Sequence, residues 1–176
     1  MNFYLMVILG ILMFVYGIIL LRKNNLVIPK SYELLLLGGL IFAPHSPNNI
    51  EIGNYISLAI LYALVVLFHR RTYTVYNTDR EYIVAKIRKL LDNNGIEYII
   101  DEDRITLIQE MQESITVKGS QKNVRISFRK AKNWEKGIIG EIKEMDHKDL
   151  QIASYNGIGF VIVAIAYIAT AYILFY

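Results

Sequence analysis

The pattern of apolar and charged positions divides the chain into alternating blocks. Three stretches carry no charged residue, at 3–21, 52–68 and 157–176. Between the last two lies a densely charged block that runs from Arg70 to Asp149. Because an α-helix needs about 20 apolar residues to cross the hydrocarbon core of a bilayer, the pattern predicts membrane helices and one water-facing domain.

A fourth apolar segment, Leu34–Ala43, is short, but it extends to residue 50 without Asp, Glu, Lys or Arg. Basic residues follow the first and third apolar stretches at Arg22, Lys23, Lys30, Arg70 and Arg71, whereas residues 44–50 contain none. Basic loops remain on the cytoplasmic side of a membrane. The charge pattern therefore predicts that the short segment also spans.

The expected fold class is a membrane protein with four transmembrane α-helices and one small α+β cytoplasmic domain between the third and fourth spans. Residues 1–69 form a membrane domain with helices at about 3–21, 31–49 and 52–69, residues 70–150 form the cytoplasmic domain, and residues 151–176 form the fourth transmembrane helix. This topology predicts a multi-pass protein of the plasma membrane with both termini outside.

The charged block shows the periodicities of an α+β domain. Thr78 and Glu81 are spaced as a capping box, which predicts a helix start, and Asn94-Gly95 suits its end. Apolar residues recur at helical spacing between these two points. Strands are expected at 73–77, 96–100, 104–108, 114–118 and 123–129, and a last helix at about 135–150. The expected order is β-α-β-β-β-β-α.

Small residues at helical spacing predict helix–helix contacts. Gly10 and Gly17 share one face of the first apolar stretch, and Gly159, Ala166 and Thr170 share one face of the last. Small residues let two helices approach closely. We interpret these faces as packing within the bundle, with homodimerisation or docking to another membrane protein as the alternative.

A basic surface surrounds the single tryptophan. Cations near anionic lipid gain about 1 kcal/mol each, and Trp favours the membrane interface, so the pattern predicts contact with anionic lipid. The alternatives are a solvated sheet face with Trp134 packed on the core, and a site for a phosphate-bearing ligand or nucleic acid. The residues concerned are Arg70, Arg71, Arg125, Arg129, Lys130, Lys132, Trp134 and Lys136.

No catalytic, cofactor or metal site is predicted. Cysteine is absent, which excludes thiol chemistry. The acidic cluster Asp101–Asp103 lacks the spaced ligands of a calcium loop and suits a hairpin turn. His147 lies near Asp146 and Asp149, without a nucleophile in the pattern.

The expected function is that of a non-catalytic integral membrane protein, whose cytoplasmic domain binds a partner or regulates a membrane complex. Two alternatives remain: an oligomerising membrane effector or pore, and a membrane enzyme that uses Asp101 or Asp103 on a lipid-borne substrate. The expected partners are the lipid bilayer, including anionic lipid, and a protein partner or second copy. Acidic and basic residues nearly balance in the charged block, so nucleic acid is not expected.

Overall fold

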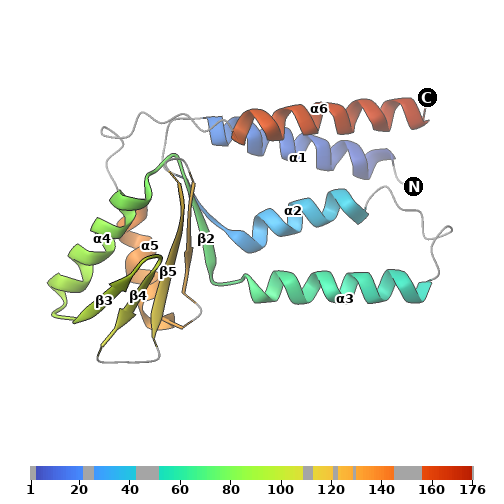
Figure 1. Ribbon diagram of the computed structural model, residues 1–176. Coiled ribbons are helices and arrows are strands. Elements are labelled where there is room, and N and C mark those ends of the chain that lie inside the picture. Colours follow the sequence, from blue (N-terminus) through green and yellow to red (C-terminus); the bar gives the residue numbers. More distant parts are fainter. Residues whose placement is uncertain are drawn as a thin grey trace. The chain divides into compact units, whose positions relative to one another are not determined.

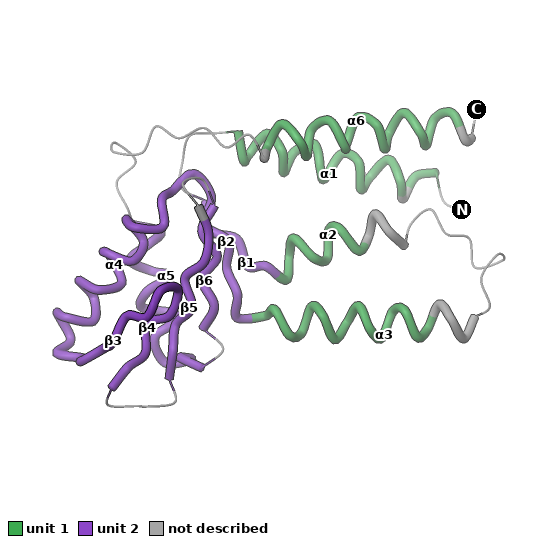
Figure 2. The backbone as a smooth tube through the Cα atoms, viewed as in Figure 1, with its two compact units in different colours: residues 1–22, 31–70, 155–176 green, residues 23–30, 71–154 purple. Residues whose placement is uncertain are grey.

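The computed structural model describes residues 3–21, 26–42, 52–108, 113–120, 123–128, 130–144 and 156–175. The chain divides into two compact units (Figure 2). The helical unit contains residues 1–22, 31–70 and 155–176, and the α+β unit contains residues 23–30 and 71–154. Each unit is described by itself below.

The α+β unit is built on an antiparallel sheet of six strands in the order β1-β2-β6-β5-β4-β3 (Figure 1). Each sequence neighbour from β3 to β6 is also a neighbour in the sheet, and β2 lies between β1 and β6. The strands are β1 (Leu26–Pro29), β2 (Thr72–Tyr76), β3 (Tyr98–Asp101), β4 (Arg104–Leu107), β5 (Ser114–Ser120) and β6 (Asn123–Ser127).

Two helices cover one face of this sheet: α4 (Arg80–Asn93) and α5 (Glu135–Lys143), the latter preceded by the 3-10 turn η2 (Lys132–Trp134). The covered face is apolar because side chains alternate between the two faces of a strand. Val124 and Ile126 of β6 and Phe128, which follows the strand, point to it and are fully buried. They pack with Ile83, Ile87 and Leu91 of α4 and with Ile138 and Ile142 of α5, which together form the core of the unit.

The strand and helix order expected for residues 70–150 is found over the described part of that range, although α5 ends at Lys143 and not near residue 150, and one strand is added to it. The segment before Lys30 was interpreted as a loop between two spans, but Leu26–Pro29 forms the edge strand β1, which pairs with β2. Pro29 is tolerated there because an edge strand has one row of backbone groups without a ladder partner.

The start of α4 differs from the predicted capping box. The helix begins at Arg80, its N-cap residue is Asp79, and no side chain caps it. The hydroxyl of Thr78 is buried and has no hydrogen-bond partner among the described residues. Between β2 and the helix, Asn77 adopts a left-handed φ of 59°.

Two glycines are required by the backbone of the turns. Gly95 adopts φ 66° directly after α4, as a left-handed helix end demands. Gly119 adopts φ 141° in β5, and a Cβ at this position would overlap the carbonyl oxygen of Asn123 on β6. Only glycine allows the two strands to approach so closely here.

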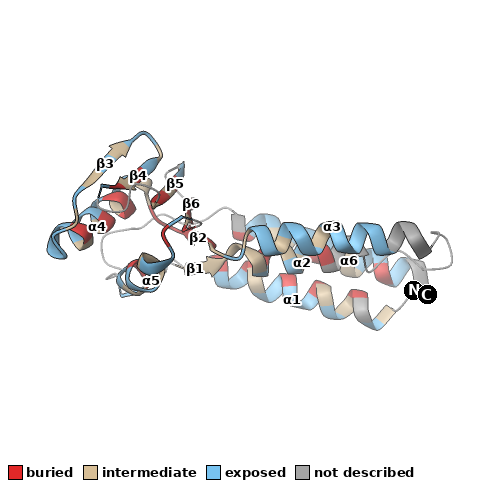
Figure 3. Ribbon diagram, turned by 90° about the horizontal axis from the view of Figure 1, so that it is seen from below, coloured by how far each residue is buried: buried red, intermediate tan, exposed pale blue. Residues whose placement is uncertain are grey.

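The helical unit contains α1 (Phe3–Leu21), α2 (Lys30–Phe42), α3 (Ile52–Phe68) and α6 (Asn156–Phe175). The first and last helices of the chain, α1 and α6, lie side by side and antiparallel (Figure 1). Most side chains of α3 are exposed, as its pale blue ribbon shows in Figure 3.

The predicted membrane fold is wrong. Among the described residues, no helix combines the length and the apolar character that a membrane crossing requires. Helix α2 has 13 residues and contains Glu33, and at 1.5 Å per residue it extends only about 20 Å.

The other expectations that depended on four transmembrane helices are also wrong. These are the multi-pass topology, the placement in the plasma membrane and the role as an integral membrane protein with a cytoplasmic domain. The membrane pore and the membrane enzyme, which were the alternatives, depended on the same spans.

Candidate functional site

The contact between α1 and α6 follows a heptad pattern on both helices. The buried seam of α1 holds Met6, Gly10, Met13, Gly17 and Leu20, and that of α6 holds Gly157, Val161, Ala164, Ile168 and Ala171, with spacings of four and three in each. This spacing keeps one stripe of each helix facing the other along its whole length.

Large and small residues alternate across this seam, so the two helices interlock. A Cβ added at Gly10 would overlap the side chain of Ile168, and one added at Gly17 would lie 2.8 Å from Cγ2 of Val161. At the same end, a Cβ on Gly157 would lie 2.7 Å from the carbonyl oxygen of Gly17. The missing side chains therefore set the close approach of α1 and α6.

The predicted small-residue positions fall on two different faces. Gly10 and Gly17 lie in the seam, whereas Gly159, Ala166 and Thr170 are exposed on α6. Nothing lies within 4 Å of a Cβ at Gly159, and the hydroxyl of Thr170 donates to the carbonyl of Ala166 at 2.8 Å. Gly159 and Ala166 each lie two positions after a seam residue, Gly157 and Ala164. At 3.6 residues per turn, an offset of two positions places the stripe on the opposite side of the helix.

The other helices of the unit meet at polar contacts. The Tyr62 hydroxyl of α3 accepts the backbone N–H of Gly38 in α2 at 3.0 Å, and a Cβ at Gly38 would overlap the Tyr62 ring. The hydroxyl of Tyr16 in α1 donates to the carboxylate of Glu33 in α2 at 3.3 Å. Glu33 is buried, so this bond replaces part of the hydration that the carboxylate loses.

Helix α3 presents apolar side chains on all sides over its described residues. Leu61 is 60% exposed, Leu64 58% and Phe68 63%. The complete set, which we name the α3 apolar surface, is Ile56, Leu58, Ile60, Leu61, Leu64, Val65, Leu67 and Phe68. Exposed apolar area of this extent on one helix is typical of an interaction surface.

The predicted basic surface is divided between separate places. Arg70 is exposed at the end of α3, and Lys130, Lys132 and Lys136 are exposed near η2 and α5. Trp134 packs against the core of the α+β unit, and Arg129 lies outside the described residues. Within the α+β unit, Arg125 lies on the uncovered face of the sheet, whereas Lys132 and Lys136 belong to η2 and α5 on the covered side.

Arg71 is engaged within the α+β unit. Its guanidinium lies 3.9 Å from the Glu135 carboxylate, which also accepts the hydroxyl of Tyr73 at 2.6 Å. The carboxylate lies in the first turn of α5, where negative charge is favourable. This cluster joins the start of β2 to the start of α5, so its contribution is structural.

The uncovered face of the sheet carries three exposed cations, of which Lys118 pairs with Asp103 at 3.9 Å. Lys118 of β5 lies directly opposite Arg125 of β6, and Arg104 of β4 lies opposite Thr116 of β5. All three basic side chains are exposed. Among the described residues, no carboxylate lies within ion-pair distance of Arg104 or Arg125. Like charges directly opposite on a sheet are destabilising, so the pair has a cost in the isolated chain.

The acidic cluster at 101–103 forms the turn between β3 and β4, as expected. Arg80 of α4 holds this turn: its guanidinium donates to the backbone oxygens of Val117, at 3.2 Å, and Glu102, and pairs with Asp103 at 3.3 Å. Over the part of the chain that the structure describes, no group of acidic or histidine side chains has the arrangement of a metal site.

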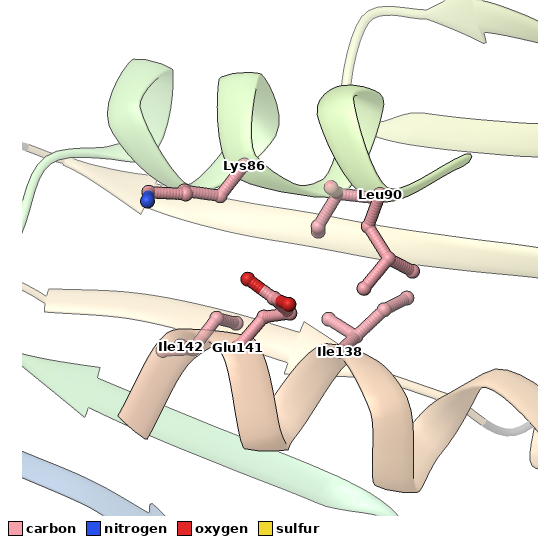
Figure 4. Close-up of a pocket in the computed structure, with 6 residues that line it drawn as sticks. Lys86, Leu90, Ile138, Glu141 and Ile142 are labelled. Carbon is pink, nitrogen blue, oxygen red and sulfur yellow. The ribbon is translucent and has the colours of Figure 1, made fainter. Parts of the chain in front are cut away.

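A groove beside α4 and α5 was not predicted from the sequence. It holds about 240 Å³ and is lined by Lys86, Lys89, Leu90, Asn93, Asn94 and Glu141. Next to it, the buried side chains of Ile87, Ile138 and Ile142 close the space between the two helices, where no room for a water remains. Figure 4 shows Lys86 and Leu90 on α4 facing Ile138 and Glu141 on α5. The spacing of Lys86, Lys89 and Asn93 on one side of a helix was the available signal.

Burial raises the pKa of the Tyr98 hydroxyl on β3, and a hydrogen bond to the side chain of Asp92 in α4 raises it further. The neutral phenol is therefore favoured where β3 meets the end of α4.

Comparison of the chain with protein-family models, with curated proteins and with solved structures finds no match in any of the three.

Proposed function

We propose that this chain is a self-assembling scaffold subunit, in which the α3 apolar surface packs against a second copy and each copy carries one α+β unit. The observation that supports this proposal most directly is the exposure of Leu61, Leu64 and Phe68, each more than half accessible. A helix that is apolar on all sides is stable when other apolar surface covers it.

The size of the surface suits a second copy of the chain. A stable interface takes about 800 Å² from each partner, and the large exposed side chains along α3, such as Leu61, Leu64 and Phe68, supply an apolar centre for one. Most assemblies of a single protein are symmetric, so the same patch of each copy takes part. The seam between α1 and α6 shows that helices of this chain pack closely in the antiparallel sense, which is one of the two arrangements that a two-fold contact between identical helices allows.

The exposed α6 stripe of Gly159, Ala166 and Thr170 is the second contact that we propose for such an assembly. It is available because the α1 seam uses the other side of the helix. Its contribution is tested separately from that of α3 by Gly159→Leu, which should weaken association without loosening α1 from α6.

The test is sedimentation equilibrium of the full chain in buffer that contains neither detergent nor lipid. We expect one defined oligomer, and we expect the double substitution Leu61→Gln with Leu64→Gln to shift it toward monomer by at least about tenfold in association constant. The matched control is Ile99→Gln, since Ile99 is also 60% exposed but lies on β3 of the other unit.

Two results would overturn the proposal. The first is a monomer at all concentrations. The second is a chain that remains dispersed only with detergent or vesicles and is monomeric there, since lipid and not a second copy would then cover α3.

A second candidate function concerns the uncovered sheet face. We propose that Arg104, Lys118 and Arg125 contact the phosphate groups of anionic lipid headgroups. The supporting observation is the direct opposition of Lys118 and Arg125. Lys118 has Asp103 as a partner at 3.9 Å, whereas no carboxylate among the described residues pairs with Arg125 or Arg104, so an anion placed beside them offsets the repulsion. A sheet face is open and suits a planar array of anions, and each cation near such a surface contributes about 1 kcal/mol.

Co-sedimentation with phosphatidylserine vesicles tests this contact, with phosphatidylcholine vesicles as the reference. Arg125→Gln should reduce binding about fivefold, whereas Lys132→Gln, near η2, should leave it unchanged. Equal losses in the two variants would contradict the assignment to this face. Binding to an acidic protein surface but not to the vesicles would contradict the choice of lipid.

A further inference from the structure

The strand β3 forms one edge of the sheet in the α+β unit, and among the described residues its outer row of backbone groups faces no other strand. The carbonyl of Glu97, which precedes β3, accepts the N–H of Ile108 at 2.9 Å. Because backbone groups alternate in direction along a strand, those of Ile99 also point to β4, whereas those of Tyr98 and Ile100 point outward. The edge therefore offers two residues whose N–H and C=O groups can pair with a further strand.

This edge is open but short. The strand contains no proline and no positive φ angle, whereas the opposite edge strand, β1, contains Pro29, whose nitrogen cannot donate a hydrogen bond. Gly95 before β3 and Glu102 after it have positive φ angles, which turn the chain at each end of the strand. A partner can therefore pair with β3 over about five residues, the usual length of a strand.

Three exposed side chains form a row on the uncovered face of this edge, because they occupy alternate positions: Glu97, Ile99 and Asp101. The side chains between them pack on the core. Ile99 is 60% exposed. Neither carboxylate forms an ion pair among the described residues, although Arg104 of β4 lies opposite Asp101. The row therefore presents an apolar side chain between two carboxylates.

We propose that β3 binds an extended basic segment of another protein, which adds a strand to the edge of the sheet. The segment pairs through its backbone with Tyr98 and Ile100. It carries Lys or Arg opposite both carboxylates, and between them an apolar residue opposite Ile99. Opposite charges that face each other directly on neighbouring strands are stabilising. In strand addition, backbone hydrogen bonds supply affinity and alternate side chains supply specificity.

A second copy of β3 fits this edge less well than a basic segment does. In an antiparallel pair centred on Ile99, Glu97 of each copy would lie opposite Asp101 of the other. Like charges directly opposite on a sheet are destabilising, so the two carboxylates disfavour self-pairing and favour a cationic partner. The site belongs to the α+β unit alone, so it does not depend on the self-assembly proposed above.

The proposal is tested by adding a capped seven-residue peptide, in which threonines alternate with lysine, valine and lysine, to the full chain. At saturation, we expect hydrogen exchange of the Tyr98 and Ile100 amides to slow at least about tenfold. The Ile99 amide, which already pairs with β4, should change little. The same peptide with glutamate in place of both lysines should bind at least about tenfold more weakly, because each charge pair becomes repulsive.

Two double variants assign the charges. Glu97→Gln with Asp101→Asn should weaken binding of the lysine peptide about fivefold, as expected for the loss of two facing charge pairs. Glu141→Gln with Glu144→Gln is the matched control, since it also removes two exposed carboxylates, here from α5 and the residue that follows it. This control should leave binding unchanged, because the net charge of the chain alters equally in both.

Four results would overturn the proposal. The first is a lysine peptide that leaves exchange of the Tyr98 and Ile100 amides unchanged. The second is equal binding of the lysine and glutamate peptides, and the third is an equal loss in the two double variants. The fourth is protection of the same amides that rises with the concentration of the chain alone, since a second copy would then occupy the edge.

Discussion

Gly10 of α1 lies against Ile168 of α6, at a distance that leaves no room for a Cβ atom. The same relationship, glycine facing a branched side chain, recurs between Gly17 and Val161. The close packing of α1 on α6 therefore requires glycine, without a Cβ atom, at these two positions.

Gly10→Ala should destabilise the helical unit, although alanine is the better helix former. Overpacking of this kind costs about 1–3 kcal/mol, which exceeds the roughly 1 kcal/mol gained in helix propensity. Gly140→Ala in α5 is the matched control, because a Cβ there meets nothing within 4 Å, and it should be stabilising. Denaturant unfolding measures both variants, and equal effects would contradict the interlocked seam.

Gly119→Ala should destabilise the α+β unit more than Gly95→Ala does. Both glycines have positive φ, which costs alanine about 1 kcal/mol. Only at Gly119 does the new Cβ also overlap backbone, at the Asn123 carbonyl, whereas Gly95 has open space. Thermal unfolding of the two variants compares the costs, and a smaller loss for Gly119→Ala would contradict the close approach of β5 and β6.

Arg80→Lys should loosen the turn between β3 and β4. The guanidinium joins two backbone oxygens and the Asp103 carboxylate at once, and an ammonium cannot reproduce this fork. We expect a loss of about 1.5–3 kcal/mol in the free energy of unfolding. Hydrogen exchange of the Asp103 and Arg104 amides should rise in parallel, while Lys118→Gln, a partner of the same carboxylate at 3.9 Å, should have a much smaller effect.

Tyr98 should make stability fall at alkaline pH. Burial and the hydrogen bond to Asp92 raise its pKa above the ordinary value of 10.0, so the folded state holds the proton more tightly than the unfolded chain. This contribution is complete below pH 10 and is lost as pH rises through the folded pKa. Unfolding measured from pH 8 to 11 should show a smaller alkaline loss for Tyr98→Phe than for the original chain.

The sequence allowed good prediction of the α+β unit, since its signals are local. The alternation of Val124, Ile126 and Phe128 and the helical recurrence of Ile83, Ile87 and Leu91 both report one buried face. The strand β1 gave no comparable signal, because four residues are too few to establish a period. Its identity depends on pairing with β2, more than forty positions further along the chain.

The helical unit shows where local pattern is insufficient. An uncharged run does not distinguish between lipid, a neighbouring helix and a second copy as its surroundings, since all three are apolar. The seam of α6 was equally ambiguous, because Gly157–Ala164–Ala171 and Gly159–Ala166–Thr170 are both stripes of small residues. Helix α1 packs on the first of these stripes, and the sequence of α6 alone does not predict which of the two it uses. The groove was missed for the same reason, since its walls come from helices about fifty residues apart.

The position of β1 has a consequence for how the molecule reaches its final form. A fragment cut to begin at residue 71 would retain the covering helices and five strands but leave the flank of β2 without its hydrogen-bonding neighbour. Bare flanks of this kind recruit other chains and promote aggregation. The strand β1, which precedes α2, therefore covers the edge of β2. The sheet is complete only when this segment, made early in synthesis, has paired with a strand that is made much later.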